Sequence, residues 1–349
     1  MYVDGPDSGP SAIINMENKM GETNARHSGA RALFNRVHGL KSGNILIVFV
    51  AIQVIAIGAS LAFPQDFRYL STSNLQVLFR SIPTLGIIAM GVNLLMISGE
   101  FDLSVGSTFA LASLVMAKLF NAGTPLIVAI LAAIAIGIMI GGVNGYIVVK
   151  SNVPSFIITL GSMWFWRGIV LLVSQASNEA FNPGPGMDAV FTASIGPVQV
   201  QFLWFVAIAI ICWFFLERHK LGNHIFATGG NVNAARALGI NVKRIKMMNF
   251  MILGALASLS GIISTTRVNN VSPIQGEGLE LQAIAACVIG GTALMGGRGS
   301  VLGAFLGAAL LFTVQDVLLL LRAPGYYLRL FVGLIIILAV VLNEILRKK

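Results

Sequence analysis

The sequence predicts an all-α membrane protein in which about ten helices cross the bilayer. Hydrophobic residues make up 56% of the 349 residues, whereas charged residues make up only 11%. Soluble domains usually carry about 25% charged residues. The apolar residues also gather into runs of about 20, the length that a helix needs to cross a hydrocarbon layer about 30 Å thick. The composition therefore excludes a soluble enzyme, a disordered protein and a secreted disulfide scaffold.

Ten apolar runs are candidate membrane spans. They are 44–63, 81–98, 103–120, 124–149, 154–174, 201–216, 247–264, 280–296, 300–321 and 326–343. The runs 201–216 and 280–296 are short for a straight crossing, and 124–149 is long enough to tilt. Segments of ten residues that alternate apolar and polar side chains do not recur, which disfavours a β-barrel.

The apolar runs divide the chain into three parts. Residues 1–43 are polar and contain no apolar core, so they are neither a signal peptide nor a span. We expect them to form a largely disordered cytoplasmic tail. Residues 44–343 are expected to form one transmembrane domain, and 344–349 a basic cytoplasmic tail.

Positive charge is distributed unevenly along the chain, whose net charge is +9. Most Lys and Arg residues lie in segments that share one side of the membrane, and the most basic of these segments is 217–246. Because positive loops are retained in the cytoplasm, we expect both termini and this loop inside, and 175–200 outside. Because the positive residues gather in short segments between the spans, we expect membrane lipid rather than nucleic acid as a partner.

Sequence motifs for catalysis or metal binding are missing. There is no G-x-x-x-x-G-K-[ST] phosphate loop and no catalytic Ser or His motif inside a span. All histidines lie outside the apolar runs, which argues against a buried metal site. Cys212 and Cys287 both lie in apolar runs and are interpreted as small apolar residues. We therefore expect no enzyme activity, metal or cofactor in this chain.

The sharpest local feature is the turn SGEFDLSVGS at 98–107. Glu100 and Asp102 lie there between two apolar runs that are separated by almost no loop. One interpretation is structural, with Asp102 or Ser104 accepting a hydrogen bond from a free N–H group of the following helix. The other is functional, because a helix break at membrane depth is tolerated only where protein or a water-filled cavity surrounds it. The turn is then a hinge or part of a substrate path.

Three further charged residues, Arg80, Arg167 and Asp316, lie nearest to the interiors of spans. Charges at membrane depth usually face the helix bundle or a cavity, so each is a candidate for a transport path. Arg80 could instead mark the end of its helix, and Arg167 could stack on the neighbouring tryptophans.

The basic loop contains the pattern of a short capped helix. Asn231 or Asn233 can cap a helix over 234–238, and Gly239 can end it. Such a helix is a candidate docking element, although a plain connecting loop is the alternative. In a later run, Gly303 and Gly307 have the small-xxx-small spacing that predicts close helix packing.

Four stretches of the sequence resemble the permease subunits of bacterial sugar ATP-binding-cassette importers of the ribose, xylose and arabinose type, in the branched-chain amino-acid and sugar permease family. The turn at 98–107 is similar to the family pattern Gly-Gly-Ile-Asp-Leu-Ser-Val-Gly-Ser, with Glu100 in place of the second glycine and Phe101 in place of the isoleucine. The other stretches are 144–168, 224–246 and 278–308. The likeness covers roughly residues 44–343.

The resemblance implies a permease that passes a monosaccharide across the bacterial inner membrane by alternating access. The implied partners are an ABC ATPase subunit, a periplasmic or lipoprotein sugar-binding protein, and a second permease copy or a sister permease. By resemblance, the ATPase-coupling loop contains Asn231, Ala234, Ala235 and Gly239. The motif near the gate contains Glu100, Asp102, Ser104 and Gly106.

Two other functions are compatible with the residues. An ABC permease for branched-chain amino acids or nucleosides has a related architecture. An ion-coupled secondary transporter would usually place carboxylates at mid-membrane, and most of the spans lack any charge.

Overall fold

The computed structural model describes residues 43–151 and 153–324, together with residues 326, 327, 330, 331, 333, 334, 337 and 341. The predicted N-terminal tail, apart from Gly43, and the predicted basic tail at 344–349 lie outside the described residues. So does most of the tenth predicted span, 326–343.

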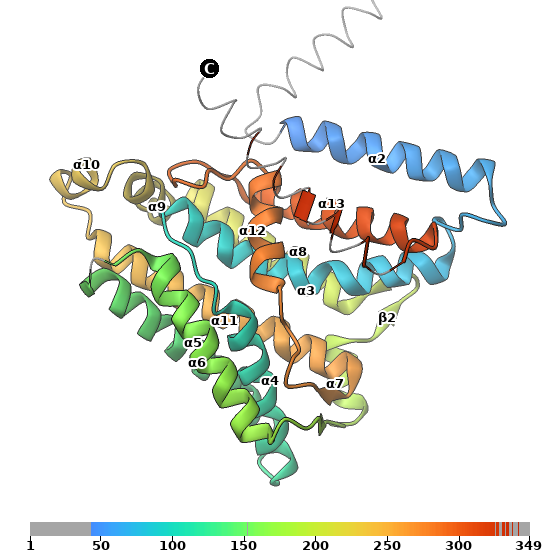
Figure 1. The fold of residues 1–349 in the computed structure, drawn as a ribbon, viewed down its shortest axis with the longest axis horizontal. Helices are drawn as coiled ribbons and strands as arrows, with labels where there is room; N and C mark the ends of the chain where they lie inside the picture. The colour runs from blue at the N-terminus through green and yellow to red at the C-terminus, as the bar shows by residue number, and fades with distance from the viewer. Residues whose placement is uncertain are drawn as a thin grey trace, which may run out of the picture. The chain divides into compact units, whose positions relative to one another are not determined.

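The described part of the chain is built from helices, as predicted (Figure 1). Seven of these helices are long and apolar enough to cross a membrane. They are α2 (Gly43–Ala62), α3 (Thr72–Ile97), α5 (Leu126–Ser151), α6 (Ser155–Ser174), α8 (Val200–Trp213) continued by the π-helical turn η1 (Phe214–Arg218), α11 (Val242–Val268) and α13 (Val301–Leu320). Two shorter apolar helices are α4 (Val105–Asn121) and α12 (Leu279–Ile289).

The remaining elements are short and belong to connections. The helices are α7 (Pro185–Phe191), α9 (Lys220–Gly230) and α10 (Val232–Ala237). The two-residue strands are β1 (Glu179–Ala180), β2 (Ser194–Ile195), β3 (Val198–Gln199) and β4 (Asn270–Val271). Strand β1 pairs antiparallel with β4, and β2 with β3, so these strands join loops rather than form a core.

Two helices begin earlier than their apolar runs predict. Helix α3 begins at Thr72 instead of 81, because the Ser71 hydroxyl accepts a hydrogen bond from the Asn74 N–H at 3.3 Å. Helix α11 begins at Val242 instead of 247, capped by the Asn241 side chain, which accepts from the Arg244 N–H at 3.0 Å. Both added turns contain polar residues, so hydropathy alone misses them, whereas the caps fix the true starts.

The predicted span 280–296 is wrong in extent. Helix α12 ends at Ile289 and has 11 residues, which span about 16 Å, roughly half the hydrocarbon layer. The following segment, 290–299, contains left-handed turns at Gly291, Gly296 and Gly297 and is not helical. The apolar run continues past the helix because this segment is itself packed against other parts of the chain.

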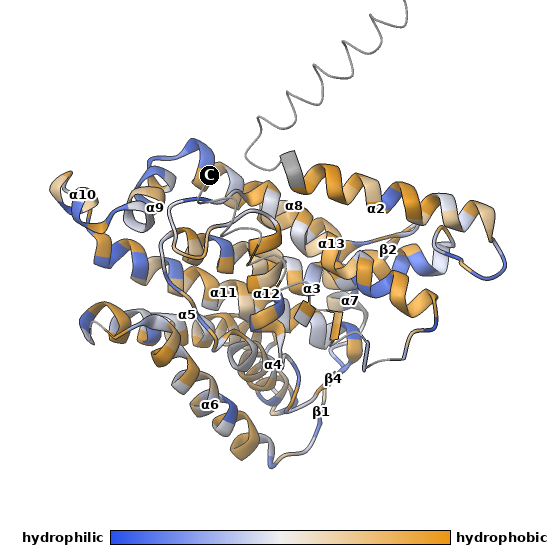
Figure 2. Ribbon diagram, turned by 45° about the horizontal axis from the view of Figure 1, so that its top comes forward, coloured by the Kyte–Doolittle hydropathy of each residue, from blue (hydrophilic) through white to orange (hydrophobic). Residues whose placement is uncertain are grey.

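The helices differ in how much of their surface is buried. Helices α3, α11 and α13 are the most buried of the long helices, whereas α2 and α6 expose most of their side chains. The exposed side chains are large and apolar, such as Ile55 on α2, Ile127 on α5 and Leu172 on α6. Figure 2 shows hydrophobic residues dominating α2, α5 and α6. An apolar outer surface of this kind is stable in lipid and not in water.

Helices α5 and α11 pack antiparallel with their backbones in close approach. A Cβ atom at Gly137 would overlap the Gly254 carbonyl oxygen, and one at Gly141 would overlap the Phe250 carbonyl oxygen. Gly145 continues the same row four residues further on, where a Cβ atom would lie 3.0 Å from the Met247 Cα. Within a membrane, small residues at four-residue spacing let two helices gain van der Waals contact that lipid cannot supply. The predicted close packing at Gly303 and Gly307 is also confirmed, against Gly290 and Ala286 of the α12 end.

The Gly141→Ala variant should lower the free energy of unfolding by roughly 1–3 kcal/mol, because the added methyl group forces α5 and α11 apart. The adjacent Gly142→Ala variant is the matched control, since its Cβ atom would meet only the flexible Met251 side chain at 3.7 Å. Thermal or denaturant unfolding of the purified protein in detergent measures both. Equal stabilities for the two variants would show that the α5–α11 approach is not tight.

Candidate functional site

The chain breaks its helical structure between α3 and α4, at the turn that the sequence singled out. The Asp102 carboxylate accepts hydrogen bonds from the Ser104 N–H at 2.7 Å and from the Ser104 hydroxyl at 2.6 Å. Ser104 makes no capping bond with its own side chain. Of the two candidates for a structural cap, Asp102 therefore holds the start of α4, and its side chain is buried.

A buried polar network ties this break to α5 and α6. The Asn144 Nδ2 of α5 donates to the Ser104 hydroxyl at 2.8 Å and to the Asp102 carboxylate at 3.2 Å. The Ser162 hydroxyl of α6 donates to the Asn144 Oδ1 at 2.7 Å. Because each buried polar group in the network has a partner, the turn is held in one geometry by two neighbouring helices.

A second break lies between α11 and α12, at residues 272–278. Helix α11 ends at Val268 and α12 begins only at Leu279, so β4 and this non-helical segment connect the two helices. The two breaks meet at Gly106, where a Cβ atom would overlap the Gly276 carbonyl oxygen and lie 2.7 Å from the Glu280 Oε2. Gly106, predicted as a motif residue, is therefore the point of contact between the breaks.

Arg167 of α6 holds the second break. Its buried guanidinium donates from Nη1 to the carbonyl oxygens of Pro273, at 2.7 Å, and Gln275, at 2.9 Å. The carboxylates of Glu277 and Glu280 interact with it electrostatically. Non-helical backbone at membrane depth needs such internal donors because lipid supplies none. The predicted stacking of Arg167 on tryptophans is not among the ring contacts of the described residues.

The other two charged candidates lie apart from the breaks. The Asp316 carboxylate of α13 is buried and accepts from the Asn74 Nδ2 of α3 at 2.8 Å. Arg80 is exposed, and its carbonyl oxygen accepts from the Arg267 Nη1 at 3.1 Å. The structure therefore brings only Arg167 of these three to the helix breaks, and Asp316 joins two helices.

Three distant segments meet in a cluster of glycines, which we call the glycine hub (Gly99, Gly229, Gly230, Gly296 and Gly297). The Gly297 N–H donates to the Ile97 carbonyl oxygen at the end of α3 at 2.8 Å. A Cβ atom at Gly296 would lie 2.8 Å from the Gly99 Cα, and one at Gly297 would lie 2.7 Å from the Gly230 Cα. The hub thus joins the first break, the end of α9 and the loop that follows α12 through direct backbone contact.

The predicted loop helix is confirmed and begins next to the hub. Helix α10 follows Gly230 after one residue, Asn231, whose Oδ1 accepts from the backbone N–H groups of Asn233 and Ala234 at 3.0 Å each. Asn231 is therefore the cap, and Gly239 follows the helix with a positive φ of 78°. Figure 1 shows α10 projecting at one edge of the helices beside α9. We call α10 the knob.

Of the two alanines predicted in the coupling loop, the knob exposes Ala234 but buries Ala235. Ala235 is 1% exposed and faces inward, whereas Leu238, which ends the knob, is 78% exposed. Asn231, Ala234 and Gly239 are also exposed. Because a residue must be exposed to touch a partner, Leu238 rather than Ala235 is the candidate for direct contact.

Glu100, the residue that departs from the family pattern, has a specific partner. Its carboxylate pairs with the Lys246 ammonium of α11, and both side chains are largely buried, at 11% and 17% exposure. The ion pair links the first break to the fifth residue of α11, nine residues after the last residue of the knob. Breaking such a pair by removing one charge usually destabilises a protein, because the other charge is left buried.

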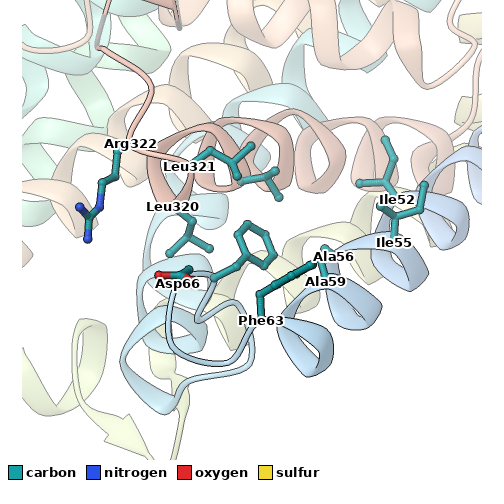
Figure 3. A pocket seen from close by; sticks show the side chains of 11 residues that line it. Ile52, Ile55, Ala56, Ala59, Phe63, Asp66, Leu320, Leu321 and Arg322 are labelled. Carbon is teal, nitrogen blue, oxygen red and sulfur yellow. The ribbon is translucent and has the colours of Figure 1, made fainter.

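A separate apolar pocket of about 660 Å³ lies between α2 and the end of α13 (Figure 3). Its lining includes Ile52, Ile55, Phe63 and Leu320, with Asp66 and Arg322 as its charged residues. An apolar lining cannot satisfy the hydrogen-bonding groups of a polar solute, so this pocket is not part of the candidate path. Among the described residues, no group of three or more His, Cys, Asp or Glu side chains could hold a metal ion.

Comparison with known proteins decides the family. The sequence pattern of the family described as "Branched-chain amino acid transport system / permease component" matches residues 74–340. The chain belongs to this family. It is a multi-pass inner-membrane permease, the membrane component of an ABC importer, which works with ATPase and substrate-binding partners.

Two groups of curated relatives are similar to this permease over most of its length. The autoinducer 2 import system permease protein LsrC of Salmonella choleraesuis (strain SC-B67) is 34% identical over 299 residues, which are 85% of this chain and 86% of the relative. The D-allose transport system permease protein AlsC of Escherichia coli (strain K12) is 35% identical over 301 residues, 86% of this chain and 91% of the relative. No solved structure matches this permease.

Several residues of the site were not identified from the sequence. Asn144 and Ser162 are polar residues within apolar runs, which is a usable signal, and Gly137, Gly141 and Gly145 recur every fourth residue. The partnership of Glu100 with Lys246 carries no such signal, since 146 residues separate the two in the sequence.

The Arg167→Met variant should make the backbone of the second break, residues 272–278, more mobile. Loss of two hydrogen bonds from a charged donor should raise amide hydrogen exchange in residues 272–278 by roughly tenfold or more. Arg80→Met is the matched control, because the exposed Arg80 contributes only its backbone carbonyl to a contact. Exchange in 272–278 that is equal in both variants would show that Arg167 does not hold this segment.

Proposed function

We propose that this permease passes a monosaccharide or a sugar-like solute inward by alternating access, driven by a separate ABC ATPase. A second copy of the chain or a sister permease completes the channel, and a periplasmic or lipoprotein binding protein delivers the solute. The observation that carries the proposal is the backbone connection from the exposed knob, through the glycine hub, to the helix breaks. The substrate class is supported by the relatives named for D-allose and autoinducer 2.

The polar groups at the two breaks have the chemistry that a hydroxyl-rich solute needs. Arg167 supplies donors, Glu280 supplies carboxylate acceptors, and the buried Gln275 Nε2 has no hydrogen-bond partner among the described residues. A buried donor without a partner costs free energy, which a solute hydroxyl or a water molecule would recover. Half-helices that end at such a place are a common device of transporter binding sites.

The knob and the basic loop around it face the cytoplasm in this proposal, with both chain termini on the same side. The support is the excess of Lys and Arg in 217–246, which follows the rule for cytoplasmic loops. The ATPase then binds at Leu238 and its exposed neighbours. ATP binding can shift the permease between inward and outward states only if the knob makes different contacts in the two states.

The helix breaks offer little support for an ion-coupled transporter. The carboxylates of Asp102, Asp316, Glu100 and Glu280 each have a hydrogen-bond or ion-pair partner within the chain, and that of Glu280 is the Gly278 N–H at 3.2 Å. A coupling-ion site would need carboxylates that are free to bind and release the ion.

Uptake by the reconstituted system tests the proposal. We expect proteoliposomes that contain this permease, its ATPase and its binding protein to accumulate radiolabelled D-allose or D-ribose only when ATP is present. Labelled leucine should not accumulate. ATP-driven uptake of leucine alone would contradict the proposed substrate class, and sugar uptake driven by an ion gradient without the ATPase would contradict the proposed mechanism.

Replacement of the exposed leucine tests the coupling surface. The Leu238→Glu variant should lower ATP-driven uptake and ATPase association by at least tenfold, because a carboxylate replaces the apolar contact. Ile195→Glu, an equally drastic change at another exposed apolar residue (65% exposed), should leave ATPase association unchanged. Co-purification of the ATPase and the initial uptake rate are the measurements.

A cysteine at position 238 tests on which side of the membrane the knob lies. Both native cysteines are buried, so a Leu238→Cys variant should be the main site for a membrane-impermeant thiol reagent. Labelling in inverted membrane vesicles but not in intact cells is expected. Labelling from outside intact cells would place the knob on the wrong side of the membrane for an ATPase.

A further inference from the structure

A small pocket of about 280 Å³ lies beside the knob, apart from the contact between the two helix breaks. Part of its wall is apolar and comes from the end of α5, at Val148 and Val149, and from Val153 and Pro154 just before α6. The remaining wall comes from the knob and the first turns of α11. The pocket therefore lies between the end of α5, the start of α6 and the base of the knob. Both α5 and α6 have exposed apolar faces.

The polar lining of the pocket is strongly basic. Arg236 of the knob and Lys243 and Lys246 of α11 contribute positive charge, and Glu100 contributes the one negative charge. Lys246 is paired with Glu100. Among the described residues, no hydrogen bond or ion pair engages the Arg236 guanidinium or the Lys243 ammonium. Two cations thus share a concave site whose one carboxylate, that of Glu100, is paired with Lys246.

Two helix ends carry an aromatic residue beside a basic one, and one of them belongs to α5, which lines the pocket. On α5, Tyr146 is 53% exposed and its hydroxyl accepts from the Lys150 ammonium at 2.8 Å. On the segment that follows α8, the Arg218 guanidinium lies 5.4 Å from the Trp213 ring centroid. Aromatic residues with basic neighbours at helix ends mark the headgroup region of the bilayer. The apolar Phe156, 53% exposed, continues the outward face of α6 beyond the pocket.

We propose that this pocket binds the phosphate group of an anionic phospholipid. The phosphate would lie between Arg236 and Lys243, and the acyl chains would follow the exposed apolar faces of α5 and α6. Basic pockets between helices at the headgroup level are suited to this chemistry. A free phosphate ion would satisfy the cations but would leave the valine wall unused, and an acidic side chain of the ATPase would do the same.

The bound lipid would act on the coupling machinery. A phosphate between Arg236 and Lys243 joins the knob to α11, and it lies next to the Glu100–Lys246 pair that holds the first break. The lipid would therefore fix the knob to the start of α11, so that movement at Leu238 is passed on to α11 instead of being lost in bending at Gly239.

Lipid binding to the purified, delipidated full-length permease tests the proposal. We expect phosphatidylglycerol to raise the unfolding temperature, whereas phosphatidylcholine and inorganic phosphate at the same concentration should leave it unchanged. In the Arg236→Gln/Lys243→Gln double variant, phosphatidylglycerol should bind roughly tenfold or more weakly in native mass spectrometry. The Lys220→Gln/Arg244→Gln double variant removes the same charge from exposed positions outside the pocket lining and should bind lipid like the wild type.

Three outcomes would overturn the proposal. Equal phosphatidylglycerol affinity in the two double variants would show that the pocket is not the site. Equal stabilisation by inorganic phosphate would assign the pocket to a free anion. Unchanged lipid affinity together with loss of ATPase co-purification in the Arg236→Gln/Lys243→Gln variant would assign the cations to the ATPase.

Discussion

The structure depends on the close approach of polypeptide backbones at positions where no side chain intervenes. Within lipid there is no hydrophobic force between helices, so van der Waals contact and hydrogen bonds must hold them together. Glycines provide that contact along α5 and α11, between α12 and α13, at the meeting of the two helix breaks, and in the hub. A methyl group at Gly106 or Gly229 would push apart the elements that the proposed mechanism couples.

The second constraint is that every charge inside the membrane must be compensated. Asp102 is held by Ser104 and Asn144, Asp316 by Asn74, and Arg167 by two backbone carbonyl groups. Each of these contacts also has a structural result, because it fixes a turn, joins two helices or supports a non-helical segment. The architecture thus accounts for these charged residues, whereas near Gly106 and Gly276 the buried Gln275 Nε2 has no hydrogen-bond partner among the described residues.

The sequence predicts the class of fold and most of the helices because hydropathy reports which segments prefer lipid. It also narrows the cap of the knob to Asn231 or Asn233 and the cap of α4 to Asp102 or Ser104, since capping and turn chemistry are local. The sequence does not predict the helix bounds, burial and pairings that long-range contacts determine. The early starts of α3 and α11 carry polar residues, the end of α12 lies inside an apolar run, and the burial of Ala235 depends on packing of the knob. The pairing of Glu100 with Lys246 arises only from the tertiary structure.

The length of α11 has a consequence for how the permease moves. This helix begins five residues after the knob and runs without interruption for 27 residues, about 40 Å, to the strand that leads into the second break. It is a rigid rod with the knob at one end and the Arg167-supported segment just beyond the other. The hub meanwhile connects the knob to the first break. A single displacement would therefore reach both breaks at once, and this mechanical linkage would keep the two halves of the pathway from opening together and leaking solute.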